Sequence, residues 1–150
     1  GFPATLFIYT DLITGSSKTL SWELVKEMSE GGLDIQNHTK THRNLSTINQ
    51  KESFKEYFDA IDFELTESER QIKKRLGKDV KYIAYPFGNT SRLVIALLKK
   101  HGYRAAFTVK RGGNPFFFDN YILDRSMVYG DFDINQFKED LSSFEQDSLE

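Results

Sequence analysis

Two of the three histidines in the chain, His38 and His42, stand four positions apart, a spacing that can serve metal chemistry. If the segment from His38 forms a helical turn, both side chains point the same way, as two ligands of one divalent ion require. We therefore predict that His38 and His42 bind a divalent metal ion, with zinc the expected one. The alternative is a pair of solvent-exposed loop histidines. A zinc-protease motif is not favoured, because Thr39 occupies the position where that motif has Glu.

The segment before the histidines, residues 33–36, alternates apolar and polar residues as a half-buried strand does. It follows the pair Gly31-Gly32, which is expected to end a preceding helix. The histidines would then lie just beyond the end of a strand. In parallel α/β proteins, ligands bind in the loops at the carboxyl ends of strands, so this position favours a functional site.

Strands and helices are predicted to alternate along the rest of the chain. Further strands are expected at residues 4–9, 80–84 and 104–109, with a possible short strand at 121–123. Helices are expected at residues 22–29, 51–75 and 92–100, and a last helix is expected to begin at 133. This alternation predicts an α/β fold with a parallel sheet or a barrel-like arrangement.

Apolar residues at helical spacing predict the face that each helix buries. The expected inward residues are Trp22, Leu24, Val25 and Met28 in the first helix, Phe54, Phe58, Ile61, Leu65 and Ile72 in the second, and Phe137, Leu141 and Phe144 in the last. The Glu and Lys residues of the second helix are assigned to a solvated face. His101 stands at a helix end beside Gly102, where capping and the helix dipole explain it, so we do not predict it as a metal ligand.

The composition limits the class of protein. A length of 150 residues suggests one domain with a real core, and 39% hydrophobic with 28% charged residues is ordinary for a soluble protein. A formal net charge of -2 gives no electrostatic reason to expect nucleic acid or an anionic membrane as a partner. The absence of cysteine excludes disulfides, thiolate metal sites and a cysteine nucleophile, and it leaves the cellular compartment open.

Membrane and targeting signals are not found in the sequence. No apolar run approaches the roughly 20 residues of a membrane span, and no signal peptide is recognised. Because the chain begins at Gly1 without Met, we expect it to be a piece of a longer protein whose targeting segment lies upstream. The aromatic content of 14% is compatible with surfaces that stack against sugars, although most rings are expected in the core.

Several motifs occur in an order that resembles one enzyme family. They are the run from Pro3 to Ile8, then Leu20-Ser21-Trp22, His38-Thr39-x-x-His42 with Leu45, Tyr85-Pro86-Phe87-Gly88, and Gly102-Tyr103-x-Ala105-Ala106-Phe107. Together they resemble the NodB-type polysaccharide deacetylases over essentially the whole chain, and most closely the branch related to poly-N-acetylglucosamine deacetylases. The resemblance implies that residues 1–150 form a distorted (β/α) barrel domain, partial at its N-terminus.

The resemblance also implies an activity and a set of site residues. It implies a hydrolase that removes acetyl groups, chiefly N-acetyl, from a polysaccharide through a metal-activated water. His38 and His42 would be the imidazole ligands, and Thr39 would steady the loop between them. The backbone N–H of Phe87 would help to bind the oxyanion. Arg125 would orient the catalytic carboxylate, for which a surface ion pair is the alternative.

Other residues are given supporting roles by the same resemblance. Pro86 and Gly88 would shape the backbone around the oxyanion site. Trp22 and the aromatic run 116–118 would be either sugar-binding aromatics or core residues. The resemblance places the protein outside the cytoplasm or at the cell surface, with an acetylated polysaccharide as its substrate.

Two parts of the family pattern are not found in this sequence. The family's first motif, an Asp-Asp pair that supplies the general base and a third metal ligand, has no counterpart before Pro3, and neither Asp11 nor Asp34 matches its position. No histidine follows His101 to act as the general acid. We therefore expect a domain that lacks its first strand, that is inactive alone, and whose open sheet edge is covered by an upstream segment or by a second copy. The alternative function is a non-catalytic carbohydrate-binding or structural domain.

Overall fold

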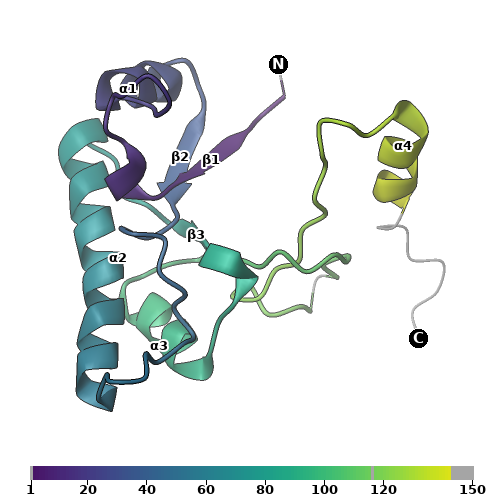
Figure 1. The fold of residues 1–150 in the computed structure, drawn as a ribbon. Coiled ribbons are helices and arrows are strands. Elements are labelled where there is room, and N and C mark those ends of the chain that lie inside the picture. Colours follow the sequence, from purple (N-terminus) through teal and green to yellow (C-terminus); the bar gives the residue numbers. More distant parts are fainter. Residues whose placement is uncertain (1, 116, 143–150) are drawn as a thin grey trace.

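A computed structural model describes residues 2–115 and 117–142, which form an α/β structure around a parallel sheet (Figure 1). The strands are β1 (Thr5–Ile8), β2 (Asp34–Asn37), β3 (Tyr82–Ala84) and β4 (Ala105–Phe107), hydrogen-bonded in the order β1-β2-β3-β4. All three pairings are parallel, and each crossover contains a helix. These helices are α1 (Trp22–Glu30), α2 (Phe54–Leu76) and α3 (Arg92–Lys100). The predicted alternation and the parallel sheet are confirmed.

The helices α1, α2 and α3 begin at serine caps, and each ends within one residue of the position that the sequence predicted. The Ser21 side chain accepts a hydrogen bond from the backbone of Leu24 at the start of α1, and Ser91 does the same at the start of α3. The helix α2 begins with a capping box formed by Ser53 and Glu56, three residues later than predicted. It ends at Gly77, whose φ of 71° is a left-handed conformation that glycine adopts without strain.

Two apolar clusters fill the space between the sheet and its helices. The larger lies among α2, α3, β3 and β4 and contains Leu45, Tyr57, Ile61, Leu65, Ile83, Tyr85, Val94, Leu97, Leu98, Tyr103 and Ala106. The smaller contains Ile8, Val25, Ile35 and Ile72, with Trp22 packed at its border. Because α2 contributes side chains to both clusters, it connects the cluster around β1 and β2 with the cluster around β3 and β4. Across the described residues, no helix is both long and apolar enough to cross a lipid bilayer.

In α1 and α2, two residues predicted to face inward are exposed instead. The side chain of Phe54 is 64% exposed, and that of Leu24 is 43% exposed. A helix of 23 residues such as α2 is about 34 Å long, whereas a four-residue strand spans about 13 Å. The first turn of α2 therefore extends beyond the sheet, and Tyr57, one turn later, takes the buried position.

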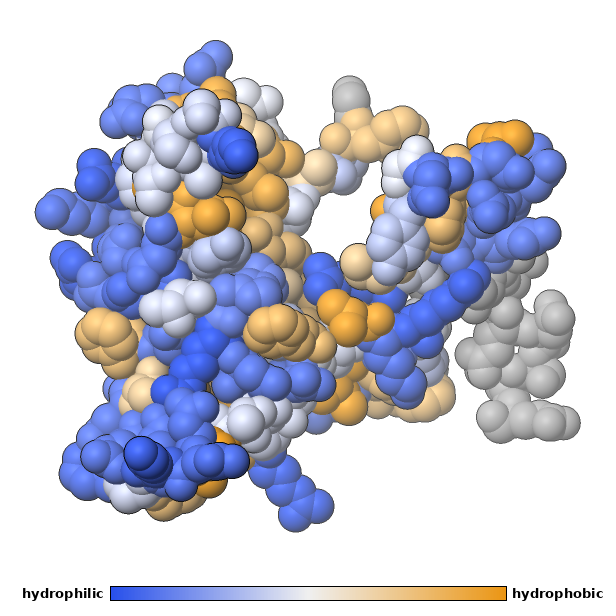
Figure 2. Space-filling model, viewed as in Figure 1, coloured by the Kyte–Doolittle hydropathy of each residue, from blue (hydrophilic) through white to orange (hydrophobic). Residues whose placement is uncertain are grey.

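The C-terminal part of the chain forms an extended arm that leaves the sheet and carries α4 (Ile134–Ser142), at the right of Figure 1. The strand expected at 121–123 is reduced to one bridge between Phe107 and Leu123. The predicted inward face of the last helix is wrong, because Phe137 is 38% and Leu141 54% exposed, and Phe144 lies outside the described residues. Figure 2 shows open space between the upper part of the arm and the body.

Candidate functional site

The predicted site residues gather at one edge of the sheet. Because all four strands are parallel, their carboxyl ends lie together. Tyr9 follows β1, His38 follows β2, Phe87 follows β3 within the short 3-10 helix η2 (Pro86–Gly88), and Thr108 follows β4. This is the edge where parallel α/β proteins place their ligand sites.

The imidazole rings of His38 and His42 meet through their Nε2 atoms, in a T-shaped arrangement. Their Nε2 atoms are 3.1 Å apart and the ring centroids are 4.7 Å apart. The predicted helical turn is wrong: residues 38–42 form an irregular loop in which Thr39 (φ 73°) and His42 (φ 67°) adopt left-handed conformations. These two unusual backbone angles bring the rings together in place of a helix.

The carbonyl of Ala84, at the end of β3, sets the tautomer of His38. Its oxygen lies 2.7 Å from Nδ1 of His38, and a carbonyl only accepts, so Nδ1 carries the proton and donates. In the neutral ring, Nε2 is then left with a lone pair directed toward His42. Burial lowers the pKa of His38, and the charges of His42 and Arg125 add to this effect against the bond to Ala84. The neutral imidazole that a metal ligand must be is therefore favoured.

A network of hydrogen bonds holds the loop between the histidines. The backbone N–H of Thr39 donates to the Asn37 side chain at 2.8 Å, and the hydroxyl of Thr39 accepts from the N–H of His42 at 3.1 Å. Both Asn37 and Thr39 are completely buried. Thr10 and Asp11, in the 3-10 helix η1 (Thr10–Leu12), donate their N–H groups to the carbonyls of residues 39 and 40.

The donor set of the histidine pair fits a divalent metal ion. A tetrahedral zinc ion with Zn–N bonds of about 2.0–2.1 Å places two imidazole nitrogens roughly 3.3 Å apart. The 3.1 Å between the Nε2 atoms of His38 and His42 is close to that distance, and a backbone carbonyl already orients His38 from behind. Within residues 2–115 and 117–142, no group of three or more His, Cys, Asp or Glu side chains is placed to hold an ion. This part of the chain therefore offers two imidazole nitrogens as candidate ligands.

The turn after β3 brings Phe87 against the histidines. Its φ of 59° is left-handed, and its ring, 60% exposed, packs edge-on against His42 with centroids 4.8 Å apart. No hydrogen bond of the described residues uses the Phe87 backbone N–H. Gly88 follows with a φ of 73°, and a Cβ there would lie 2.7 Å from the backbone nitrogen of Val109. Gly88 thus permits the close approach of this turn to the segment after β4.

Arg125 lies on the other side of the same edge. Its Nε donates to the carbonyl of Thr108 at 2.8 Å, and its guanidinium carbon lies 5.8 Å from the ring of Phe7 and 5.9 Å from that of Phe107. Burial lowers the pKa of Arg125. No carboxylate among the described residues pairs with it, so the alternative of a surface ion pair is not what this part of the structure contains.

A mainly apolar cavity of about 240 Å³ opens beside the histidines. His38, His42 and Tyr9 line it together with apolar residues of β1 and of the loop that follows. The ring of Tyr9 is 5.1 Å from that of His42. Of the other aromatic residues considered, Trp22 packs at the border of the smaller cluster beneath Arg75, which is a core role. Phe117 is 69% exposed, and Phe116 lies outside the described residues.

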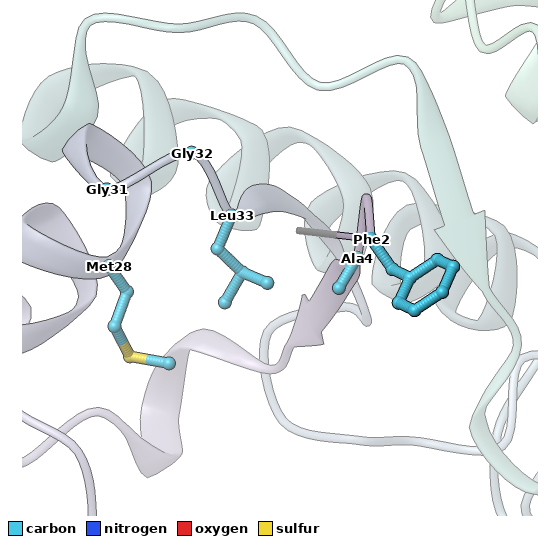
Figure 3. A pocket seen from close by; sticks show the side chains of 6 residues that line it. All are labelled: Phe2, Ala4, Met28, Gly31, Gly32 and Leu33. Atoms are coloured by element: carbon cyan, nitrogen blue, oxygen red, sulfur yellow. The ribbon is translucent and has the colours of Figure 1, made fainter.

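A second hollow, of about 360 Å³, lies at the opposite end of the sheet (Figure 3). Its lining residues come from the segment before β1, from the last part of α1 and from the turn between α1 and β2, and they are Phe2, Ala4, Met28, Gly31, Gly32 and Leu33. None of these side chains can titrate or act as a nucleophile, and the Met28 thioether is the one possible metal ligand in this lining. Of these two hollows, the one beside the histidines is therefore the one that carries titratable side chains.

The third histidine is part of a structural cluster. His101 ends α3, and its backbone N–H bonds to the carbonyl of Leu97 as a cap. Its Nδ1 lies 3.1 Å from Glu69, and its Nε2 lies 3.1 Å from Asp62. Capping and the helix dipole are therefore only part of its explanation, because these two carboxylates of α2 also hold it.

Three contributors to the site were missed by the sequence analysis: the side chains of Tyr9, Asn37 and Glu64. Asn37 ends β2, where a polar residue could be read as a strand terminus, and Tyr9 was included in a strand. Glu64 was assigned to a solvated face, yet it is only 4% exposed. Its position between Ile61 and Leu65, within the apolar stripe of α2, was the available signal.

Comparison with known proteins identifies the family. The sequence profile described as polysaccharide deacetylase matches residues 1–106. The chain therefore belongs to the polysaccharide deacetylase family, as its motifs predicted.

Individual relatives narrow the likeness. The poly-β-1,6-N-acetyl-D-glucosamine N-deacetylase of Staphylococcus aureus (strain MRSA252) is 28% identical over 134 residues, which cover 86% of this chain and 46% of that protein. The enzyme of the same description from Staphylococcus epidermidis gives the same values. This chain thus spans about half the length of these relatives.

A solved structure of a polysaccharide deacetylase from Bacillus cereus is 28% identical, with a TM-score of 0.74 over 94% of this chain and 42% of that chain. A Streptococcus pyogenes deacetylase in complex with acetate shares the fold at 23% identity, with a TM-score of 0.81 over 96% of this chain and 59% of that chain. The α/β fold of the deacetylase type is therefore confirmed. In the described residues its strands form an open sheet with β1 at one edge.

Proposed function

We propose that this chain provides the metal-binding and oxyanion-binding edge of a metal-dependent polysaccharide N-deacetylase. The observation that carries the proposal is the facing pair of Nε2 atoms, 3.1 Å apart, with the tautomer of His38 fixed by a backbone carbonyl. Membership of the polysaccharide deacetylase family supports the reaction class. The descriptions of the staphylococcal relatives support an N-acetylglucosamine polymer as the substrate class.

In this proposal, His38 and His42 hold one divalent ion, with zinc the expected one. When bound, such an ion supplies Lewis-acid chemistry, because it polarises a carbonyl oxygen and makes a coordinated water more acidic. The role of His38 is to present a neutral nitrogen. The buried hydrogen bonds of Asn37 and Thr39 hold the loop so that the two rings keep their relative positions.

The backbone N–H of Phe87 is proposed to bind the oxygen of the acetyl group. Its N–H is unused within the described residues, and the ring packing against His42 places this turn beside the metal ligands. A backbone donor held by a rigid turn stabilises a developing oxyanion without reorganising during the reaction. Pro86 and Gly88 would fix that turn, the first through its locked φ and the second through its close approach to Val109.

Arg125 is proposed to bind and orient a carboxylate that comes from outside the described residues. Its guanidinium is held by the Thr108 carbonyl and by two aromatic rings, so its direction is set before any partner arrives. A half-buried guanidinium favours a bidentate carboxylate partner. The third metal ligand and the general base are likewise assigned to residues outside the described ranges, since within those ranges no third His, Asp or Glu side chain is placed to complete a metal site with His38 and His42.

The substrate and location follow from the same assignment. The exposed ring of Phe87 offers an apolar surface at the rim of the site, which suits the face of a sugar. An acetylated glucosamine polymer at the cell surface or outside the cell is the proposed substrate.

The test is acetate release from N-acetylated β-1,6-linked glucosamine oligomers by the protein at its full natural length. We expect release that stops on chelation, returns with zinc, and is lost in the His38→Ala, His42→Ala double variant. His101→Gln is the matched control and should retain activity, because that ring contacts only α2 carboxylates. The 150-residue chain alone is expected to bind zinc without releasing acetate. Full activity of the double variant would refute the assignment, and glycan binding without any acetate release would favour a non-catalytic carbohydrate-binding domain.

A further inference from the structure

Glu64 is a buried carboxylate that faces the histidine loop. It lies on α2, is 4% exposed, and forms no salt bridge within the described residues. Its oxygens accept hydrogen bonds from the N–H of Lys40 at 2.9 Å, the N–H of Thr41 at 2.8 Å and the hydroxyl of Thr41 at 2.7 Å. A buried charge is unfavourable unless hydrogen bonds compensate it, and here all three donors come from the segment between His38 and His42.

The backbone of this segment needs such a restraint. Thr39 and His42 both have left-handed φ angles, which cost free energy in residues other than glycine and persist only where the surroundings enforce them. Glu64 binds residues 40 and 41, which lie between those two angles. A shift of the peptide groups at 40 and 41 would therefore rotate one imidazole away from the other.

The loop is held on two sides. Thr10 and Asp11 of η1 donate to the carbonyl oxygens of residues 39 and 40, while Glu64 accepts from the N–H groups of residues 40 and 41. Lys40 also pairs with Asp11 through its side chain at 2.7 Å. Within the described residues, Glu64 alone holds the N–H groups of residues 40 and 41 from another element, so α2 controls one of the two restraints.

We propose that Glu64 is the positioning residue of the site, whose carboxylate fixes the loop conformation that turns the Nε2 atoms of His38 and His42 toward each other. It acts through the backbone and contacts neither the ion nor the substrate. The proposal rests on the assignment of the two histidines in the proposed function, but it concerns a loop geometry that can be measured without metal.

Three variants at this position separate positioning from general stability. Glu64→Leu introduces an apolar side chain of similar size and removes every hydrogen-bond acceptor. Glu64→Gln retains one carbonyl oxygen for the two backbone donors and offers its amide to the Thr41 hydroxyl, which can accept, so it should restore the loop. Glu64→Asp withdraws the carboxylate by one carbon. Ile72→Val is the matched control, because Ile72 is fully buried in the same helix but belongs to the cluster around β1 and β2.

The primary measurement is NMR of the metal-free 150-residue chain, using amide exchange at Lys40 and Thr41 and the ring nitrogen shifts of His38 and His42. For Glu64→Leu we expect amide exchange at least about tenfold faster, because bonds to a charged acceptor are lost, and displaced shifts for both rings. Glu64→Asp should change in the same direction, whereas Glu64→Gln and Ile72→Val should stay within about threefold of the parent for exchange. If Glu64→Leu does not fold, Glu64→Asp decides.

The secondary measurement is zinc affinity. We expect Glu64→Leu to weaken binding by about tenfold, in the range found when residues that orient metal ligands are removed. Unchanged ring shifts and amide exchange in both the Leu and Asp variants would overturn the proposal, as would equal changes in Ile72→Val. If the parent chain bound no zinc at all, the proposed function would fail, and the NMR measurements would still decide the role of Glu64.

Discussion

The described chain places histidine in two environments that differ in what surrounds the ring nitrogens. At the sheet edge, the Nδ1–H of His38 donates to the Ala84 carbonyl, and its Nε2 is directed toward His42. At the end of α3, both nitrogens of His101 face carboxylates, of Glu69 and Asp62. The first arrangement favours a neutral ring with a free lone pair, and the second favours an imidazolium that donates twice.

The direction of the pKa shifts follows from these neighbours. Burial is the main cause that lowers the pKa of His38, with a smaller electrostatic contribution from Arg125, whereas hydrogen bonds to Glu69 and Asp62 raise the pKa of His101 against its own desolvation. A metal ligand must be deprotonated, whereas two neighbouring carboxylates favour the protonated form of the His101 ring. The role of each histidine is therefore set by the groups that hydrogen-bond to its ring, a backbone carbonyl for His38 and two carboxylates for His101.

The largest expected difference between the two environments is in zinc binding. His38→Ala or His42→Ala should weaken zinc binding by about 100-fold or more, because either change removes a ligand rather than a residue that orients one. His101→Ala should leave the affinity within about twofold, since its ring lies between carboxylates of α2. Isothermal titration with zinc measures all three variants. Equal losses of zinc affinity in His101→Ala and His38→Ala would show that the two histidine environments do not differ in metal binding.

The sequence predicted the histidine pair, the strand before it and the parallel sheet, because local periodicity and serine and glycine signals survive without knowledge of tertiary contacts. It did not predict how His38 and His42 meet. Their contact depends on left-handed angles at Thr39 and His42, which are enforced by groups more than 20 residues away, such as the Glu64 carboxylate. Periodicity does not report contacts of this range.

The helix faces show the same limit. In α2, the apolar spacing correctly placed Ile61, Leu65 and Ile72 in the core. It failed at Phe54, because the spacing does not report where a long helix extends past a short sheet. It failed in α4 for a related reason, since an amphipathic pattern predicts a face to bury without specifying what covers it.

A substitution at Gly88 would disturb the turn that carries Phe87 while leaving the three histidines and their hydrogen-bond partners unchanged. Gly88→Ala should destabilise the fold by about 1–3 kcal/mol. The reason is that the new Cβ would meet Val109 at a left-handed φ of 73°. Since the ring of Phe87 packs on His42, the ring resonances of His42 should shift while those of His101 remain in place. Urea unfolding and NMR measure the two effects. A parental midpoint together with unshifted His42 signals would show that this turn is not coupled to the site.

The smallest expected effect is the pH dependence contributed by His101. Its pKa is raised in the folded chain, chiefly by the hydrogen bond to Glu69 and then by that to Asp62. A histidine in the unfolded chain titrates near pH 6.5. The stabilisation is therefore fully present below about pH 6.5 and is lost as the pH rises through the higher folded pKa. Solvent screens these partly exposed carboxylates, so we expect a contribution of about 0.5–1 kcal/mol.

The difference in unfolding free energy between the parent and His101→Gln should accordingly be largest in mildly acid solution and shrink above neutrality. Glu69→Gln should reduce the same pH dependence, while His38→Ala should leave this pH-dependent term unchanged. A difference that grew with rising pH would mean that His101 is neutral in the folded protein, and the contrast with the histidine pair would then have to be drawn on geometry alone.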